Sequence, residues 1–278
     1  MLLYCAGYNP QREREALAEA RQAGVDGILM APSLHIADLD VRQRYLDELR
    51  AARRAVPTVP TVYVERRLPD DDAEFVSSDP VAGAALAVRH LAGLGRRRIA
   101  FIGPTRSAPA EAIYAGYRRG LADARLAEDA DLVLRTHTWG REPQQDEAAV
   151  RALMSLAQPP VGILCMGDEY AFRVYYTLRS IGVRVPQDVS LVAYDDVVAH
   201  LLEVPLTAVS PPKYEVGRQA AGLLCRRLAE GAAAPIQQVI LKPRLVVRGT
   251  CGAPAEVAED RPERHLPEQE LAYELVHG

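Results

Sequence analysis

The sequence predicts an α/β protein made of two doubly wound parallel-sheet lobes that are joined by a hinge. Short runs rich in Val, Ile and Leu alternate with stretches of about 12 to 18 residues of helical periodicity, which is the pattern of βαβ units around a parallel sheet. The alternation runs in two consecutive series, and Gly103 lies between them. The chain has 278 residues, which is long enough for two compact units.

The first series of units begins at the N-terminus. An apolar run at residues 2–5 is expected to form a strand. Asn9 then caps a helix whose first residue is Pro10, and Gly24 ends that helix. The remaining elements expected in this series are strands over residues 27–31, 59–64 and 98–102 and helices over residues 40–55 and 79–94, the latter begun by Asp79-Pro80 and ended by Gly95.

The second series follows Gly103. Its expected helices cover residues 110–124, 144–157, 168–181 and 213–229, and its expected strands cover residues 131–136, 161–165, 190–193, 207–209, 236–241 and 244–248. We therefore expect a first lobe of residues 1–103 plus 210–231 and a second lobe of residues 104–209 plus 232–252. The tail, residues 253–278, is rich in proline and glutamate and poor in large apolar side chains, so it is expected to be flexible.

Composition narrows the classes of function. The formal net charge is -4 and the basic residues are interspersed with acidic ones, so the chain lacks the electrostatic footprint that binds a nucleic acid by itself. The four cysteines have no C-x-x-C spacing and the histidines do not cluster, so neither a metal site nor a disulfide framework is predicted. The absence of a membrane-spanning run and of a signal peptide predicts a cytoplasmic protein.

Several stretches of the sequence are similar to one family. The most specific is GVRVPQDVSLVAYDD at residues 182–196. The others are NPQREREAL at 9–17, GVDGIL at 24–29, VER at 64–66, SDPVAG at 78–83, LGRRRIA at 94–100, PLTAV at 205–209 and PRLVVR at 243–248. Together they resemble the ligand-binding domain of the LacI/GalR family of transcriptional regulators, and the resemblance spans residues 2–250.

The resemblance implies both a fold and a function. The fold would be of the periplasmic binding protein type I kind. The function would be that of an effector-sensing domain, which binds a small polar molecule such as a sugar or nucleoside between its lobes and changes the DNA binding of a regulator. Family members begin with a DNA-binding head, a first strand and a first helix that this sequence lacks, so contact with DNA is expected only through a head domain outside this chain. A homodimer is also implied, with the helices near residues 11–24 and 79–94 as candidate surfaces.

Candidate site residues are those that directly follow strands, because ligands of two-lobed α/β proteins lie at the carboxyl ends of parallel strands. Glu65 and Arg66 follow the strand at 59–64, where the family usually has Asp-Arg with the acid facing the ligand. A carboxylate at this place accepts hydrogen bonds from vicinal hydroxyls. The alternative is a solvated Glu–Arg pair. Thr105 and Arg106 follow the strand at 98–102 and are either ligand contacts or loop residues.

Two further carboxylates follow strands of the second series. Asp168 is either a ligand contact or, as we favour, the N-cap of the next helix. Asp195 occupies the position where the family has a ligand-binding carboxylate, and turn chemistry at a strand end is the alternative; for the neighbouring Asp196 we favour that turn role. Two residues depart from the family: Ile113 stands where an arginine usually grips the ligand, and Gly167 replaces an asparagine. The identity of the effector is therefore not predicted.

Two other classes of function compete with this interpretation. A solute-binding protein of a transporter would share the fold. A metal-assisted hydrolase would use Glu65, Asp168 and Asp195 as carboxylate ligands. No G-x-S-x-G, P-loop, G-x-G-x-x-G or H-E-x-x-H motif accompanies these residues. We therefore expect no catalytic residues, no metal and no cofactor.

Overall fold

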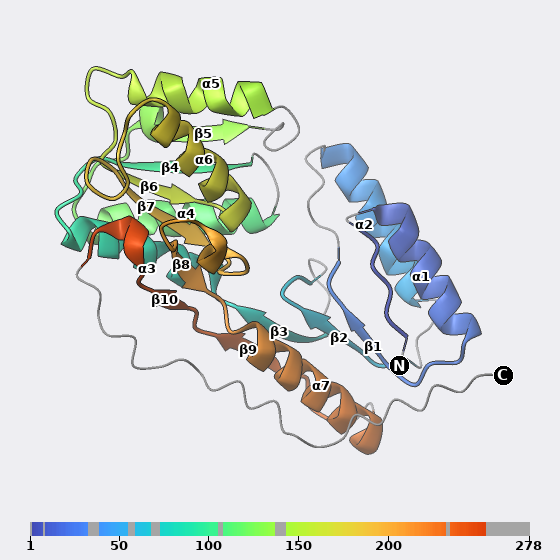
Figure 1. Ribbon diagram of the computed structural model, residues 1–278. Coiled ribbons are helices and arrows are strands. Elements are labelled where there is room, and N and C mark those ends of the chain that lie inside the picture. Colours follow the sequence, from blue (N-terminus) through green and yellow to red (C-terminus); the bar gives the residue numbers. More distant parts are fainter. Residues whose placement is uncertain are drawn as a thin grey trace, which may run out of the picture.

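The structure is a computed structural model, and its described residues are 2–7, 9–32, 39–54, 59–67, 73–104, 108–136, 143–231 and 234–253. They form two lobes, each built on its own sheet (Figure 1). The expected tail, residues 253–278, lies outside the described residues except for its first position. The two-lobed α/β fold predicted from the sequence is confirmed.

The first lobe contains a four-stranded parallel sheet in the order β1-β2-β3-β9. Its strands are β1 (Ile28–Met30), β2 (Thr61–Val64), β3 (Glu74–Ser78) and β9 (Gln238–Leu241). The helices α1 (Pro10–Gln22) and α2 (Leu39–Arg54) cover one face of the sheet and α7 (Lys213–Glu230) covers the other. Along β2, Val62 points toward α7 and Tyr63 toward α1 and α2, as the alternation of side chains in a strand requires.

The second lobe contains a six-stranded sheet in the order β10-β8-β7-β6-β4-β5. Its strands are β4 (Ile99–Pro104), β5 (Val133–Thr136), β6 (Gly162–Cys165), β7 (Ser190–Tyr194), β8 (Thr207–Ser210) and the antiparallel β10 (Arg244–Val246). Helices α3 (Pro80–Gly93) and α4 (Ala108–Asp123) pack on one face, and α5 (Pro143–Met154) and α6 (Asp168–Ser180) on the other. The short 3-10 helices η1 (Ala130–Leu132), η2 (Ala199–Leu201) and η3 (Gly249–Cys251) complete this lobe.

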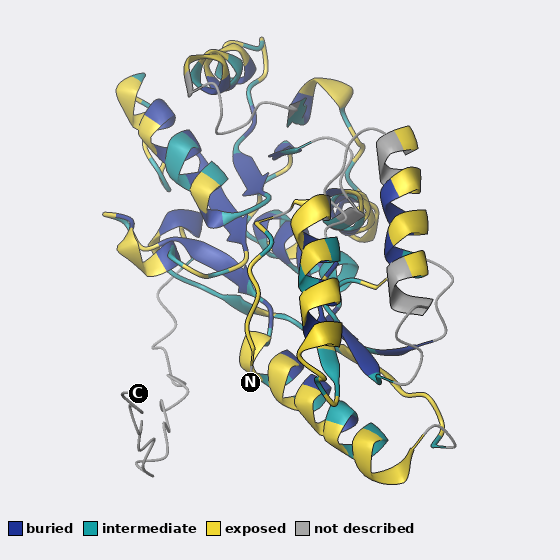
Figure 2. Cartoon of the chain, turned by 90° about the vertical axis from the view of Figure 1, so that its right-hand side faces the viewer, coloured by how far each residue is buried: buried dark blue, intermediate teal, exposed yellow. Residues whose placement is uncertain are grey.

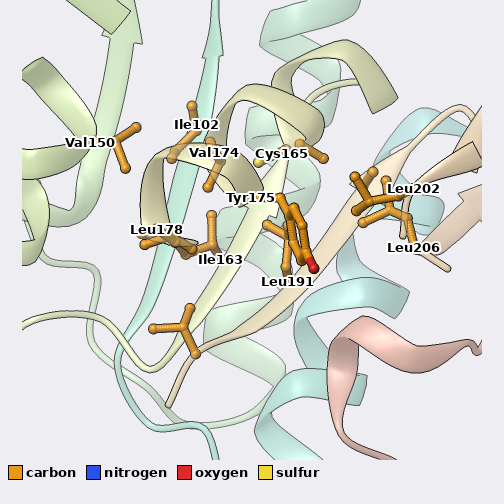
Figure 3. Packing of buried hydrophobic residues seen from close by; sticks show 14 of the residues in the cluster. Ile102, Val150, Ile163, Cys165, Val174, Tyr175, Leu178, Leu191, Leu202 and Leu206 are labelled. Atoms are coloured by element: carbon orange, nitrogen blue, oxygen red, sulfur yellow. The ribbon is translucent and has the colours of Figure 1, made fainter. Parts of the chain in front are cut away.

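The central strands of the second lobe, β4, β6 and β7, are largely apolar because helices cover them on both sides. In the second lobe, Ile102, Ile163 and Leu191 project from neighbouring strands toward Val174 and Leu178 of α6 (Figure 3). Figure 2 shows the same division in the whole molecule, with buried residues on the strands and exposed residues on the outer faces of the helices.

Local capping explains why two of the predicted helices begin where the sequence indicates. The Asn9 side chain accepts hydrogen bonds from the backbone N–H groups of Gln11 at 2.9 Å and Arg12 at 3.3 Å. The Asp79 side chain accepts one from Ala82 at 2.9 Å. Each cap satisfies N–H groups that lack a partner within the helix.

Two element predictions are corrected. Residues 2–5 are described without a strand assignment, and Leu2 and Leu3 are exposed, because the segment pairs with no strand among the described residues. The sequence reasoning also missed β3. Its run of Glu74, two serines and only two apolar residues looks polar, yet Glu74 is buried.

The lobe boundaries also differ from those expected. β4 pairs with β5 and β6, and α3 packs in the core of the second lobe, so the chain first crosses at Ser78–Asp79 and not after Gly103. β9 pairs with β3, so it belongs to the first lobe and not to the second. The other two crossovers join β8 to α7 and β9 to β10. Residues 213–230 lie in the first lobe, within the range expected there.

Candidate functional site

The candidate site lies where β2 of the first lobe and β7 of the second end, next to the crossovers. We define this interlobe site as Glu65, Arg66, Asp168, Asp195 and Lys213. Asp195 is within electrostatic reach of the other four side chains. Four of the five were predicted from the sequence, and the structure brings those four together.

Glu65 is held by the end of β3. Its backbone has a φ of +59°, which is uncommon for a residue with a side chain, and its N–H donates to Val76 at 2.8 Å. Oε2 of its carboxylate accepts hydrogen bonds from the Ser78 hydroxyl at 2.9 Å and the Ser78 N–H at 3.3 Å. One carboxylate oxygen is thus oriented by the protein, which fixes the direction of the other.

Arg66 reaches in another direction from the same turn. Its Nε donates to the carbonyl oxygen of Pro32 at 2.8 Å, which ties the turn after β2 to the turn after β1. The side chain is half-buried. A planar guanidinium fixed in this way has its other N–H groups at set angles, which suits a hydroxyl or carboxylate acceptor.

Asp195 sits in a strained turn at the end of β7. Its φ is +104° and that of Asp196 is +52°. Its N–H donates to Val209 at 3.0 Å, and its carbonyl oxygen accepts a hydrogen bond from the Lys213 ammonium. Three non-glycine residues with positive φ, Glu65, Asp195 and Asp196, thus lie at the ends of strands beside the hinge, and such strain is concentrated at functional sites.

Electrostatics at Asp195 oppose its ionisation. The side chain keeps 55% of its surface exposed, yet desolvation by the surrounding protein is the main cause that raises its pKa. Asp168 and Glu65 raise the pKa further, whereas Lys213 and Arg66 lower it. An effector whose hydroxyls donate to this carboxylate would stabilise its charged form.

Asp168 does not cap α6. Gly167 occupies the N-cap position, and its φ of +120° with ψ of 151° is open to glycine and strained for any other residue. Asp168 is buried, and its Oδ2 accepts hydrogen bonds from the N–H groups of Val197 at 2.6 Å and Val198 at 2.8 Å. The capping role that we favoured from the sequence is therefore wrong: the carboxylate holds the loop that follows Asp195.

Two residues of the site region were missed from the sequence. Lys213 begins α7, and Tyr194 ends β7 with its ring buried against Gly83 and Pro243 at the crossovers. Burial raises the pKa of Tyr194. Lys213 is one of two lysines in the chain, beside Lys242. That rarity, together with a position directly after a strand and two prolines, is the signal that would have found it.

The remaining predicted residues have other outcomes. Thr105 and Arg106 lie outside the described residues. Asp196 pairs with Arg248 at 2.7 Å, in keeping with a turn role. Ile113 is buried in the core between α3 and α4. The described part of the chain contains no group of three or more His, Cys, Asp or Glu side chains that could hold a metal ion.

Two other features of the described residues bear on ligands and membranes. A hollow of about 260 Å³ lies between α5 and α6, lined by Asp146, Phe172, Arg173, Tyr176 and other side chains of these helices. It shares no residue with the interlobe site. Within the described ranges, no helix is long and apolar enough to cross a membrane.

Comparisons with known proteins add independent information. The family profile of a periplasmic binding protein-like domain matches residues 88–251. The chain is 30% identical over 243 residues to the ribose operon repressor of Escherichia coli strain K12, a match that covers 86% of this chain and 69% of the repressor. It is 33% identical over 238 residues to the HTH-type transcriptional regulator MalR of Streptomyces coelicolor, covering 84% of this chain and 66% of MalR.

Solved structures agree with these relatives. The transcriptional regulator CelR in complex with cellobiose matches with a TM-score of 0.69 and 31% identity, covering 86% of this chain and 70% of CelR. A LacI-family regulator from Sanguibacter keddieii matches with a TM-score of 0.70 and 32% identity, covering 90% of this chain and 86% of that protein.

Proposed function

The chain belongs to the LacI family of transcriptional regulators and is an effector-sensing domain of that family, and from this premise we propose that it binds a small polyhydroxylated effector at the interlobe site. The observation that carries the proposal is that Glu65 and Arg66 of the first lobe lie within electrostatic reach of Asp195 of the second lobe at the hinge. Charged side chains on both sides of a hinge can be bridged by one ligand, which then favours the closed arrangement of the lobes.

The chemistry of the site supports a sugar or a related polyol. The carboxylate of Glu65 is fixed through one of its oxygens, and that of Asp195 through its backbone carbonyl group. Both carboxylates can accept hydrogen bonds from neighbouring hydroxyls of the effector, and Arg66 and Lys213 can donate to its ring or hydroxyl oxygens. The relatives named for ribose and bound to cellobiose are consistent with this class. The absence of an arginine at Ile113 leaves Arg66 and Lys213 as the cationic donors of the site within the described residues.

The route from the effector to DNA would be a change of lobe angle. The three crossovers carry Asp79, Lys213 and Pro243, and all three lie beside Tyr194 or Asp195. Closure of the site would rotate one lobe on the other, and a DNA-binding head joined to the first lobe would be repositioned. We place this activity in the cytoplasm, where operator DNA is found, and expect binding without turnover.

A homodimer would carry the change between two heads. Of the two helices that the sequence indicated for its surface, α3 is largely buried against α4 and the second sheet, so it offers little free area. The exposed side of α1 is the better of the two candidates.

The proposal is tested by thermal shift and calorimetry with D-ribose, cellobiose, sugar acids and nucleosides. A sensor domain predicts saturable binding of at least one polyol and a rise in melting temperature without product formation. Asp195→Ala is expected to abolish both. Binding that survives Asp195→Ala and Glu65→Ala would exclude the interlobe site, and product formation would favour an enzyme.

A further inference from the structure

Lys213 connects the two lobes at the candidate site. It is the first residue of α7, which packs on the sheet of the first lobe. Its ammonium donates a hydrogen bond to the carbonyl oxygen of Asp195 in the second lobe, and Nζ lies 3.9 Å from Asp195 Oδ1. The same ammonium therefore bonds to the backbone of one residue across the hinge and forms a long ion pair with its carboxylate.

The turn that carries Asp195 is held from three directions. Asp168 accepts from the N–H groups of Val197 and Val198, and Arg248 pairs with Asp196 at 2.7 Å. Both of these contacts come from the second lobe. Among the side-chain hydrogen bonds and ion pairs that the structure describes at this turn, only those of Lys213 come from the first lobe. A rotation of the lobes would preserve the first two contacts and alter the third.

We propose that Lys213 is a positioning residue for effector binding, which holds Asp195 from the first lobe and links the orientation of that carboxylate to the angle between the lobes. The proposal rests on the proposed function, since it concerns how an effector is received. The strain at Asp195 is consistent with it: a φ of +104° persists only where surrounding contacts hold it, and Lys213 supplies one of them.

The charges around Asp195 give the proposal a measurable consequence. Desolvation raises the pKa of this carboxyl; Lys213 and Arg66 oppose the rise, and Asp168 and Glu65 add to it. Replacing the ammonium with an apolar group removes one of the two opposing cations. The pKa of Asp195 then rises further, and effector binding that requires the carboxylate is lost at a higher pH than in the wild type.

The first test needs no effector. With only two lysines in the chain, selective labelling with ¹⁵N-lysine gives two side-chain NMR signals, which Lys213→Arg and Lys242→Met assign. We expect the Lys213 signal to shift as Asp195 titrates and this step to vanish in Asp195→Asn. The exposed Lys242, which lies at another crossover, serves as the matched control and should show no such step. A Lys213 signal that is the same in wild type and Asp195→Asn throughout the titration would overturn the proposal.

The second test measures binding of the strongest polyol found in the thermal-shift panel. Lys213→Met should weaken binding about tenfold, the effect of losing one hydrogen bond from a charged group, and should move the acid limb of the binding profile to higher pH. Lys213→Arg should restore most of the affinity, and Lys242→Met should bind like the wild type. Equal pH profiles for Lys213→Met and the wild type would overturn the positioning role. If no polyol binds, the proposed function fails, while the NMR step still decides whether Lys213 acts on Asp195.

Discussion

The guanidinium of Arg248 lies 2.7 Å from the carboxylate of Asp196 and ties the segment after β10 to the strained turn after β7. Arg248 also donates to the Leu206 carbonyl oxygen at 2.7 Å, so one side chain bonds both to the turn after β7 and to the residue before β8. Both partners are largely buried, which limits the screening of their charges by solvent.

Removing this ion pair should destabilise the second lobe. Asp196→Ala loses the charged hydrogen bond and also places alanine at a φ of +52°, so we expect a loss of about 3 kcal/mol in the free energy of unfolding. Asp196→Gly loses the same bond without the backbone strain and should cost about 1 kcal/mol less. Urea unfolding measures both losses. Glu147→Ala is the control: it breaks the exposed ion pair with Arg151 and should change stability by less than about 0.5 kcal/mol. Equal losses for Asp196→Ala and Asp196→Gly would show that the turn is not strained.

Asp195→Asn should separate stability from binding. The raised pKa means that folded Asp195 holds its proton to a higher pH than the unfolded chain does. The wild type therefore loses stability as the pH rises through the interval between the unfolded and folded pKa values, and Asp195→Asn does not. We expect the melting temperature of Asp195→Asn to exceed that of the wild type at neutral pH by an amount that shrinks toward about pH 4, while binding is lost. A gap that widens on acidification would contradict the direction of this pKa shift.

Asp168→Ala should loosen the loop that follows Asp195. The change leaves the N–H groups of Val197 and Val198 without their carboxylate partner, so we expect a cost of about 3 kcal/mol in stability together with weaker effector binding. Asp168→Asn keeps one acceptor oxygen and should cost about 1 kcal/mol. The exposed neighbour Glu169 is the control, because Glu169→Ala removes an equal charge from the same helix turn. Hydrogen exchange of the backbone N–H groups of residues 197 and 198 should accelerate in Asp168→Ala and stay unchanged in Glu169→Ala. Unchanged exchange in both variants would show that Asp168 does not hold this loop.

Elements that depend on interactions between residues close together in the sequence could be predicted, whereas those that depend on residues far apart in the sequence could not. The starts of α1 and α3 depend on Asn9 and Asp79 and on residues within three positions of them, so local patterns were sufficient. β3 was missed because the burial of Glu74 depends on Arg226 and Arg227, whose guanidinium groups lie 2.7 and 2.6 Å from its carboxylate but 152 and 153 residues away in sequence.

The same reasoning applies to the site. Glu65 and Asp195 were found because they directly follow strands, and a parallel sheet places all such residues at one edge. Lys213 was missed because it follows β8 only after two prolines, and its contact with Asp195 arises from the crossover from β8 to α7. Asp168 has the residue type of a helix cap, and only the fold shows that Gly167 takes the cap position and leaves the carboxylate to the loop at Val197.

The close packing of α3 on α4 depends on Gly116. A Cβ atom at this position would lie 2.4 Å from the backbone oxygen of Val81 and 2.7 Å from the Cβ of Ala84, and neither atom can move without shifting α3. Gly116→Ala should therefore cost about 2 kcal/mol, as overpacking of a core does. Gly222, inside α7, is the matched control because nothing lies within 4 Å of the position a Cβ would take, so Gly222→Ala should add up to about 1 kcal/mol of stability through helix propensity.

Since α3 starts at the first crossover, a shift of this helix would also move Asp79 and Gly83 against Tyr194. Gly116→Ala should accordingly weaken effector binding as well as stability, whereas Gly222→Ala should leave binding unchanged. Urea unfolding should show a loss of stability in Gly116→Ala and a gain in Gly222→Ala. A change of the same sign in both variants would contradict the close packing at Gly116.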